Sequence, residues 1–157
     1  MRMIKQKPGS NECAACVVAM LTDRTKDEIL ASVSDPEKPD YFWLRFMRTL
    51  GFSLEDVRND RDFDTGFAWK GMFNGYLMLP TGNRYYCSVR VAKGEHALAV
   101  DESGMVFDPS TSAPMVGTCT LAQYLRFNQA KFHTIVIGCC YRVREVDQAG
   151  EGNPSWF

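Results

Sequence analysis

The sequence lacks a long apolar run. No stretch of the 157-residue chain approaches the roughly 18 apolar residues that a membrane-spanning helix needs. Arg2, Lys5 and Lys7 precede an apolar run of only about nine residues, and Thr22-Asp23-Arg24 offers no small-residue cleavage pattern. We therefore expect neither a secretory signal nor a membrane segment, and we predict a soluble, cytoplasmic protein.

The sequence also lacks an excess of charge of either sign. Its 18 basic and 19 acidic residues give a net charge of −1. No basic block is present that would attract nucleic acid phosphates or acidic lipids. Neither nucleic acid nor a membrane surface is an expected partner.

Internal repeats and low-complexity segments are absent as well, and the composition is that of one compact domain. Apolar residues make up 45% and aromatic residues 12% of the chain, which is enough for one core and too little for two. We predict a single domain over residues 1–146. Residues 147–157, rich in Gly and polar residues, are predicted to form a C-terminal tail.

The six cysteines are an even number, as disulfide-bonded proteins often have. However, the chain is large and apolar enough to build its core without covalent cross-links. We expect reduced thiols.

Helical patterns come first in the sequence and strand patterns later. Residues 12–22 are apolar on every side, which predicts a buried central helix with Ser10 and Asn11 as possible caps. A Thr25–Glu28 capping box predicts a short helix to about residue 33. This order predicts an α+β fold with an antiparallel sheet. The other predicted elements are helices over 41–50 and 120–128, and strands over 52–57, 75–79, 84–91, 96–101, 105–108 and 132–143.

Cys13 and Cys16 form a Cys-x-x-Cys pair with four possible interpretations. A thioredoxin-like redox pair would need a surrounding βαβ unit, and too little chain precedes Cys13 for one. A zinc site would need two more ligands, but Cys139 and Cys140 are adjacent in a predicted strand and point to opposite faces. Both thiols could simply be buried in a core helix, as free cysteines often are. Cys13 could instead be a nucleophile.

The position of Cys13 at the start of an apolar helix favours the nucleophile. Unpaired N–H groups and the positive end of the helix dipole stabilise a thiolate there. Such a nucleophile also needs a base, and the base needs an orienting group. The chain has only two histidines. His133 shares its predicted strand face with Ile135 and Ile137, which is typical of a core or edge position.

His96 begins a predicted hairpin whose turn lies at residues 102–104. If the loop has three residues with Gly104 in the left-handed conformation, Leu98 lies opposite Asp108. His96 and Asp108 are then diagonal neighbours on one face, roughly 7 to 8 Å apart at the backbone, whereas Asp101 points to the other side. A two-residue turn would reverse this arrangement. Taken alone, the hairpin also fits His96 and Asp108 as ordinary surface residues of a half-exposed strand.

Two motifs carry a resemblance to a known family. The first is NECAACVVAML over residues 11–21, with Gln6 upstream: an acidic residue precedes the cysteine, and Ala-Met follows on the helix. The second runs from His-Ala-Leu-Ala-Val at 96–100 to Asp-Pro at 108–109. In this order they resemble the papain-like cysteine peptidases, in particular free-standing relatives of the bacterial bacteriocin-processing peptidases that cleave double-glycine leaders.

The resemblance implies a papain-like fold and a role for each of four residues. Cys13 would be the nucleophile, His96 the base and Asp108 the residue that orients the imidazole, and Gln6 would form the oxyanion hole with the Cys13 N–H. The implied activity is a cysteine peptidase or amide/isopeptide hydrolase that acts on a peptide or protein through a thioester. No metal or other cofactor is expected.

Two other functions remain open. Ala14 stands where the family usually has glycine, and the Gln6–Cys13 spacing is one residue longer than usual. These departures favour a catalytically silent relative that binds a peptide or partner protein in the same cleft. A thiol oxidoreductase that uses Cys13 and Cys16 is the third alternative.

Overall fold

The computed structural model describes residues 1–57, 79–91, 94–110, 119–132 and 135–146. In these ranges the chain forms four helices and a five-stranded antiparallel sheet, which confirms the predicted α+β class. The helices are α1 (Cys13–Thr22), α2 (Lys26–Ser32), α3 (Asp40–Thr49) and α5 (Leu121–Phe132). The strands are β1 (Phe52–Asp56), β2 (Arg84–Val91), β3 (Gly94–Val100), β4 (Val106–Phe107) and β5 (Ile135–Glu145).

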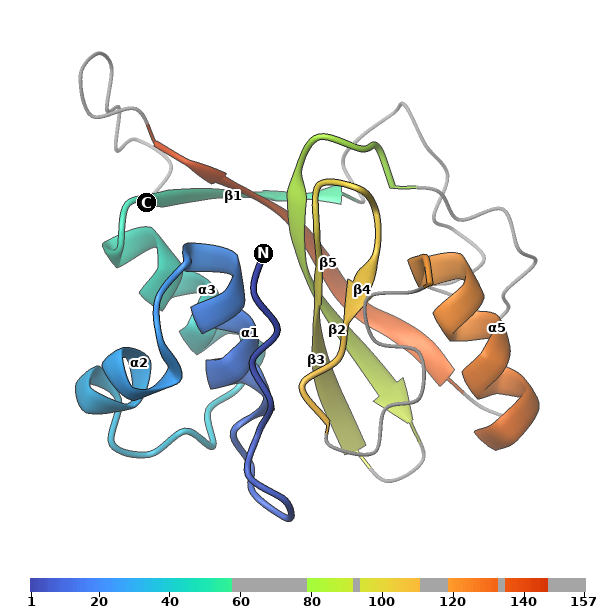
Figure 1. The fold of residues 1–157 in the computed structure, drawn as a ribbon, viewed down its shortest axis with the longest axis horizontal. Coiled ribbons are helices and arrows are strands. Elements are labelled where there is room, and N and C mark those ends of the chain that lie inside the picture. The colour runs from blue at the N-terminus through green and yellow to red at the C-terminus, as the bar shows by residue number, and fades with distance from the viewer. Residues whose placement is uncertain (58–78, 92–93, 111–118, 133–134, 147–157) are drawn as a thin grey trace.

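The last strand that the structure describes, β5, lies inside the sheet rather than at its edge. The strand order is β1-β5-β2-β3-β4, and every neighbouring pair is antiparallel (Figure 1). β5 therefore separates β1 from β2, while β2, β3 and β4 follow one another as a meander.

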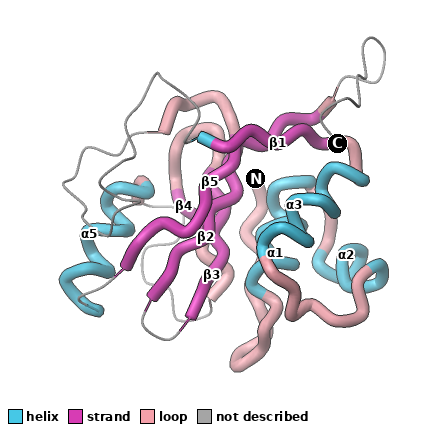
Figure 2. The backbone as a smooth tube through the Cα atoms, turned by 180° about the vertical axis from the view of Figure 1, so that it is seen from behind, coloured by secondary structure: helices cyan, strands magenta, loops and turns pink. Residues whose placement is uncertain are grey.

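Helices lie on both sides of the sheet. Figures 1 and 2 show α1, α2 and α3 together on one side and α5 on the other. Each side has its own hydrophobic cluster. The first joins the three N-terminal helices to residues such as Tyr86 and Ala97, and the second joins α5 to residues such as Cys87 and Leu98. Alternate residues of β2 and β3 thus serve opposite cores, as strand geometry requires.

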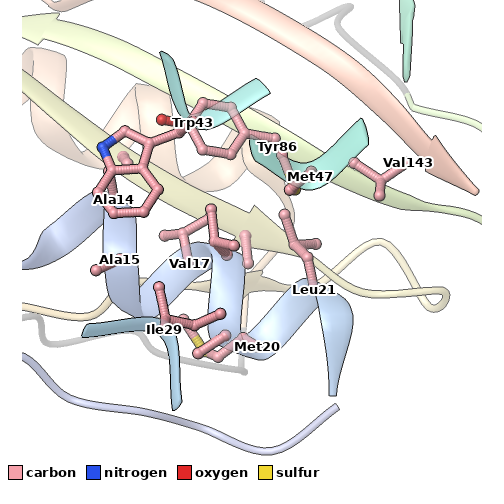
Figure 3. Packing of buried hydrophobic residues seen from close by; sticks show 14 of the residues in the cluster. Ala14, Ala15, Val17, Met20, Leu21, Ile29, Trp43, Met47, Tyr86 and Val143 are labelled. Carbon is pink, nitrogen blue, oxygen red and sulfur yellow. The ribbon is translucent and has the colours of Figure 1, made fainter. Parts of the chain in front are cut away.

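Helix α1 is the centre of the first cluster. Every residue from Ala14 to Thr22 is buried, as the apolar pattern predicted. Figure 3 shows α1 side chains packed against Ile29 of α2, Trp43 and Met47 of α3, and Tyr86 of β2. Burying one large apolar side chain contributes about 1.5–3 kcal/mol, so this packing holds the helix and its first residue in place.

The N-terminal end of α1 is stabilised differently from the prediction. The N-cap residue is Glu12, and no side chain caps the helix. The predicted caps Ser10 and Asn11 are therefore wrong, because the Ser10 hydroxyl donates instead to the Lys7 carbonyl, 2.6 Å away, and shapes the preceding loop. At the other end Asp23 adopts a left-handed conformation with φ of 55°, and the Arg84 guanidinium donates to the free Leu21 carbonyl at 3.1 Å.

Most other predicted elements agree with the structure. The Thr25–Glu28 capping box is present with both of its hydrogen bonds. The prediction of a strand at Phe132 was wrong, because this residue belongs to α5, and β5 spans Ile135–Glu145. Apart from Leu79, the predicted strand over 75–79 lies outside the described residues, as do His133 and the tail over 147–157. Of the helices that the structure describes, none has the length and apolar character needed to cross a bilayer.

Candidate active site

Cys13 is the first residue of α1 and is half-buried. Its sulfur interacts with the His96 side chain and with the backbone at Ala97 and Ala14. Burial alone would raise the pKa of the Cys13 thiol. The hydrogen bond and charge of His96, together with these two backbone contacts, outweigh burial, so the pKa lies below its usual value. The thiolate form of Cys13 is therefore easier to reach than that of an ordinary cysteine.

His96 joins Cys13 to Asp108. Its Nε2 atom lies 2.5 Å from Oδ1 of Asp108, which leaves Nδ1 as the ring nitrogen available to Cys13. Burial lowers the pKa of the imidazole, but the hydrogen bonds and charges of Asp108 and Cys13 outweigh it and raise the pKa to about 10. The lowered thiol pKa and the raised imidazole pKa together favour a thiolate–imidazolium pair.

Asp108 follows β4 and is only 4% exposed. Its carboxylate accepts three hydrogen bonds: from His96 Nε2, from the Ser110 N–H at 2.8 Å and from the Tyr124 hydroxyl at 2.7 Å. Burial raises the pKa of the carboxyl, and these donors with the imidazolium charge lower it further than burial raises it. Asp108 is therefore ionised at neutral pH and supports a protonated His96.

The hairpin has the geometry that the sequence predicted. Gly104 has a φ of 83°, and Asp101 and Met105 close the turn with an N–H to carbonyl bond of 3.0 Å. Ala99 pairs with Phe107, which places Leu98 opposite Asp108. His96 and Asp108 are diagonal neighbours in contact, whereas the Asp101 carboxylate accepts the Met105 N–H within the turn.

Gln6 is bonded to the chain next to Asp108, but its side-chain amide bonds elsewhere. Its backbone N–H donates to the Pro109 carbonyl at 2.9 Å, next to Asp108. Its side-chain Nε2 donates to the Ser10 carbonyl, also at 2.9 Å. Within the described residues, Oε1 of Gln6 is buried without a hydrogen-bond partner, and no hydrogen bond joins Gln6 to Cys13. The structure thus places Gln6 next to the segment that carries Asp108, but its side-chain amide does not bond Cys13.

The loop before Cys13 is held by an ion pair. The Glu12 carboxylate accepts the Lys7 N–H at 3.2 Å and lies 3.2 Å from Lys26 Nζ on α2. The Glu12 pKa is lowered: burial opposes its ionisation, but the Lys7 N–H and the Lys26 ammonium outweigh it. These contacts fix the segment that leads into Cys13.

Cys16 differs sharply from Cys13. It is completely buried in α1, and burial raises the pKa of its thiol to about 12. The two adjacent cysteines of β5 point to opposite faces, as predicted: Cys139 packs on the first core, and the Cys140 sulfur lies 3.1 Å from that of Cys87 in the second. All six cysteines are free.

Sequence reasoning missed Tyr124. This residue of α5 donates its hydroxyl to Asp108, and the contact depends on how α5 packs against the sheet. The helix itself was predicted over residues 120–128, close to the observed start of α5 at Leu121. No local signal could have paired Tyr124 with Asp108.

The described residues contain no group of three or more His, Cys, Asp or Glu side chains placed to hold a metal ion. The arrangement of Cys13, His96 and Asp108 can perform nucleophilic and acid–base chemistry with protein groups alone.

Comparisons with models of known protein families and with characterised proteins find no match. The interpretation therefore depends on the geometry of the site.

Proposed function

We propose that this protein is a papain-like cysteine peptidase, or a related amide or isopeptide hydrolase, that acts on a peptide or protein. The observation that carries the proposal is that His96 interacts with Cys13 on one side and bonds Asp108 on the other. The pKa values of the two residues support the proposal as well. The pKa of the Cys13 thiol is lowered, and the pKa of the His96 imidazole beside it is raised to about 10.

The reaction follows from these groups. The Cys13 thiolate attacks the carbonyl carbon of the scissile bond, and protonated His96 gives its proton to the leaving amine, which departs and leaves a thioester. His96 then takes a proton from water as that water attacks the thioester, and the acid product and the Cys13 thiolate are released. Asp108 keeps the imidazole oriented and stabilises its charge.

The oxyanion of each tetrahedral intermediate needs donors. The Cys13 N–H has no partner within α1, because it belongs to the first turn. Gln6 has a second amide hydrogen beyond the one given to Ser10. A donor of this kind contributes about 2.7–4 kcal/mol to transition-state stabilisation.

Selective chemistry at Cys13 tests the proposal. A thiol-reactive probe should label Cys13 faster than the other five cysteines. Each of these five either has a thiol with a raised pKa or lies inside one of the two cores. Labelling should fall strongly in His96→Ala. Equal labelling of all six thiols, or no effect of His96→Ala, would contradict the proposal.

A catalytically silent binding module is the second candidate, and the Gln6 amide favours it. That amide is held by the Ser10 carbonyl, and Ala14 replaces the family's usual glycine next to the nucleophile. Hydrolysis of a panel of peptides and ubiquitin-like conjugates, lost in Cys13→Ala, would support the peptidase. Peptide binding that survives Cys13→Ala without any turnover would support the silent module.

A thiol oxidoreductase has less support. Such an enzyme would need Cys16 to attack or leave as a thiolate, yet burial raises its pKa to about 12. The free thiols of the structure fit a reducing compartment, and we propose the cytoplasm as the location.

A further inference from the structure

The carboxylate of Asp108 is held at both of its oxygens. Oδ1 receives His96 Nε2 and the Ser110 N–H, whereas Oδ2 receives only the Tyr124 hydroxyl among the described residues, at 2.7 Å. Asp108 is 4% and Tyr124 8% exposed, so water has little access to this bond. Hydrogen bonds to a buried, ionised acceptor are stronger than those between neutral groups.

Tyr124 is itself held in a fixed place relative to Asp108. Thr120 and Gln123 bond reciprocally at the start of α5, with N to O distances of 3.2 and 2.9 Å. The segment before the helix joins the hairpin, because the Val106 N–H donates to the Cys119 carbonyl at 2.8 Å. Tyr124 therefore approaches Asp108 from an element that is bonded to the same hairpin.

We propose that Tyr124 is a positioning residue of the Cys13–His96–Asp108 site: its hydroxyl fixes the plane of the Asp108 carboxylate so that Oδ1 faces the imidazole. This inference rests on the proposed function. Without the hydroxyl, Oδ2 loses its donor and the carboxylate can rotate about its side-chain bonds. The orientation of His96, and through it the contact with Cys13, then becomes less defined.

Tyr124→Phe removes the hydroxyl and keeps the ring. Tyr85→Phe is a matched control, because Tyr85 is also buried in the second core and donates its hydroxyl to a protein acceptor, the Pro80 carbonyl, at 2.8 Å. Both variants should lower the melting temperature, and Tyr124→Phe should lower it more because its hydroxyl bonds an ionised acceptor. Only Tyr124→Phe should also lower kcat, by about tenfold with KM unchanged, since a loss of about 1.4 kcal/mol in the transition state alone has that effect.

The rate at which iodoacetamide alkylates Cys13 gives a second readout that needs no substrate. It should fall in Tyr124→Phe and stay unchanged in Tyr85→Phe. In an Asp108→Asn background, Tyr124→Phe should cause little further loss of alkylation rate, because the two residues act as one unit. A merely structural role for Tyr124 would instead give independent, additive effects.

The outcomes separate this inference from the proposed function. If Cys13 alkylation does not depend on His96, the proposed function fails and the inference fails with it. If alkylation depends on His96 but is the same in Tyr124→Phe and Tyr85→Phe, only the role of Tyr124 is overturned. Additive losses in the Asp108→Asn background would overturn that role as well.

Discussion

Nε2 of His96 lies 2.5 Å from Oδ1 of Asp108, and both residues belong to one tight hairpin. The contact raises the pKa of the imidazole, which reaches about 10 although burial opposes its protonation. His96 therefore remains an acid that can protonate a leaving amine well above the usual histidine pKa of about 6.5.

Asp108→Asn should lower the pKa of the His96 imidazole, because it removes the negative charge that favours the protonated ring. We expect kcat/KM to fall by about tenfold or more, because each unit of imidazole pKa corresponds to about 1.4 kcal/mol. The alkaline limb of the pH–rate profile should move to lower pH, since His96 then loses its proton earlier. Peptide hydrolysis measured across the pH range checks both effects.

Asp101→Asn is the matched control for Asp108→Asn. Asp101 is on the same hairpin, and its carboxylate accepts the N–H groups of Ser103 and Met105 within the turn. Asparagine keeps an acceptor oxygen for those bonds, so the alkaline limb should stay in place. A shift of equal size in both variants would show that net charge, and not the contact with His96, sets the imidazole pKa.

The sequence was sufficient for those parts of the site that depend on local rules. The all-round apolar pattern located α1 and put Cys13 at its start. The turn at Gly104 set the register of the hairpin, and this register brought His96 and Asp108 together. Both inferences needed only helix and strand periodicity and the conformational freedom of one glycine.

Other parts depend on tertiary packing that no short stretch of sequence encodes. The place of β5 between β1 and β2 is decided by which strands share a core face. The bond from Tyr124 to Asp108 depends on the packing of α5. The Gln6 amide was expected to face an oxyanion, yet its bond to Ser10 arises from the loop that precedes α1.

The protonated state of His96 should also contribute to stability in a pH-dependent way. Its pKa is about 10 in the folded protein and about 6.5 in an unfolded chain. Its contribution is therefore fully present below about pH 6.5 and is lost as the pH rises through about 10. The free energy of unfolding of the wild type should exceed that of His96→Ala most at the lower end of this window.

Urea unfolding at several pH values measures that difference. Val89→Ala is a suitable control, because Val89 is buried and pairs with His96 across β2 and β3 but does not titrate. Its cost in unfolding free energy should not vary with pH. A constant difference between the wild type and His96→Ala would contradict the raised imidazole pKa.

Cys16→Ala distinguishes the peptidase from the oxidoreductase. The peptidase mechanism predicts that labelling of Cys13 and peptide hydrolysis persist, because Cys16 is buried and its thiol pKa is raised to about 12. The loss of a buried sulfur should cost about 1 kcal/mol of unfolding free energy, measurable by urea denaturation. Activity that disappears in Cys16→Ala, in a variant that still folds, would favour the redox mechanism.

Gln6→Ala tests whether the amide contributes to an oxyanion hole. The backbone bond from Gln6 to the Pro109 carbonyl does not involve the side chain, so the N-terminal segment should stay in place. If the second amide hydrogen reaches the oxyanion, kcat should fall by about 100-fold or more with little change in KM, because the interaction exists only in the transition state.

Lys5→Ala is the control for Gln6→Ala, because Lys5 Nζ attaches the same segment to the Ser110 carbonyl at 2.9 Å but offers nothing to the reacting carbonyl. Its kcat should stay near that of the wild type. An unchanged kcat in Gln6→Ala would mean that the amide remains with Ser10 throughout the reaction. The oxyanion would then depend on backbone N–H groups at the start of α1, and the longer Gln6–Cys13 spacing would mark a real departure from the papain-like site.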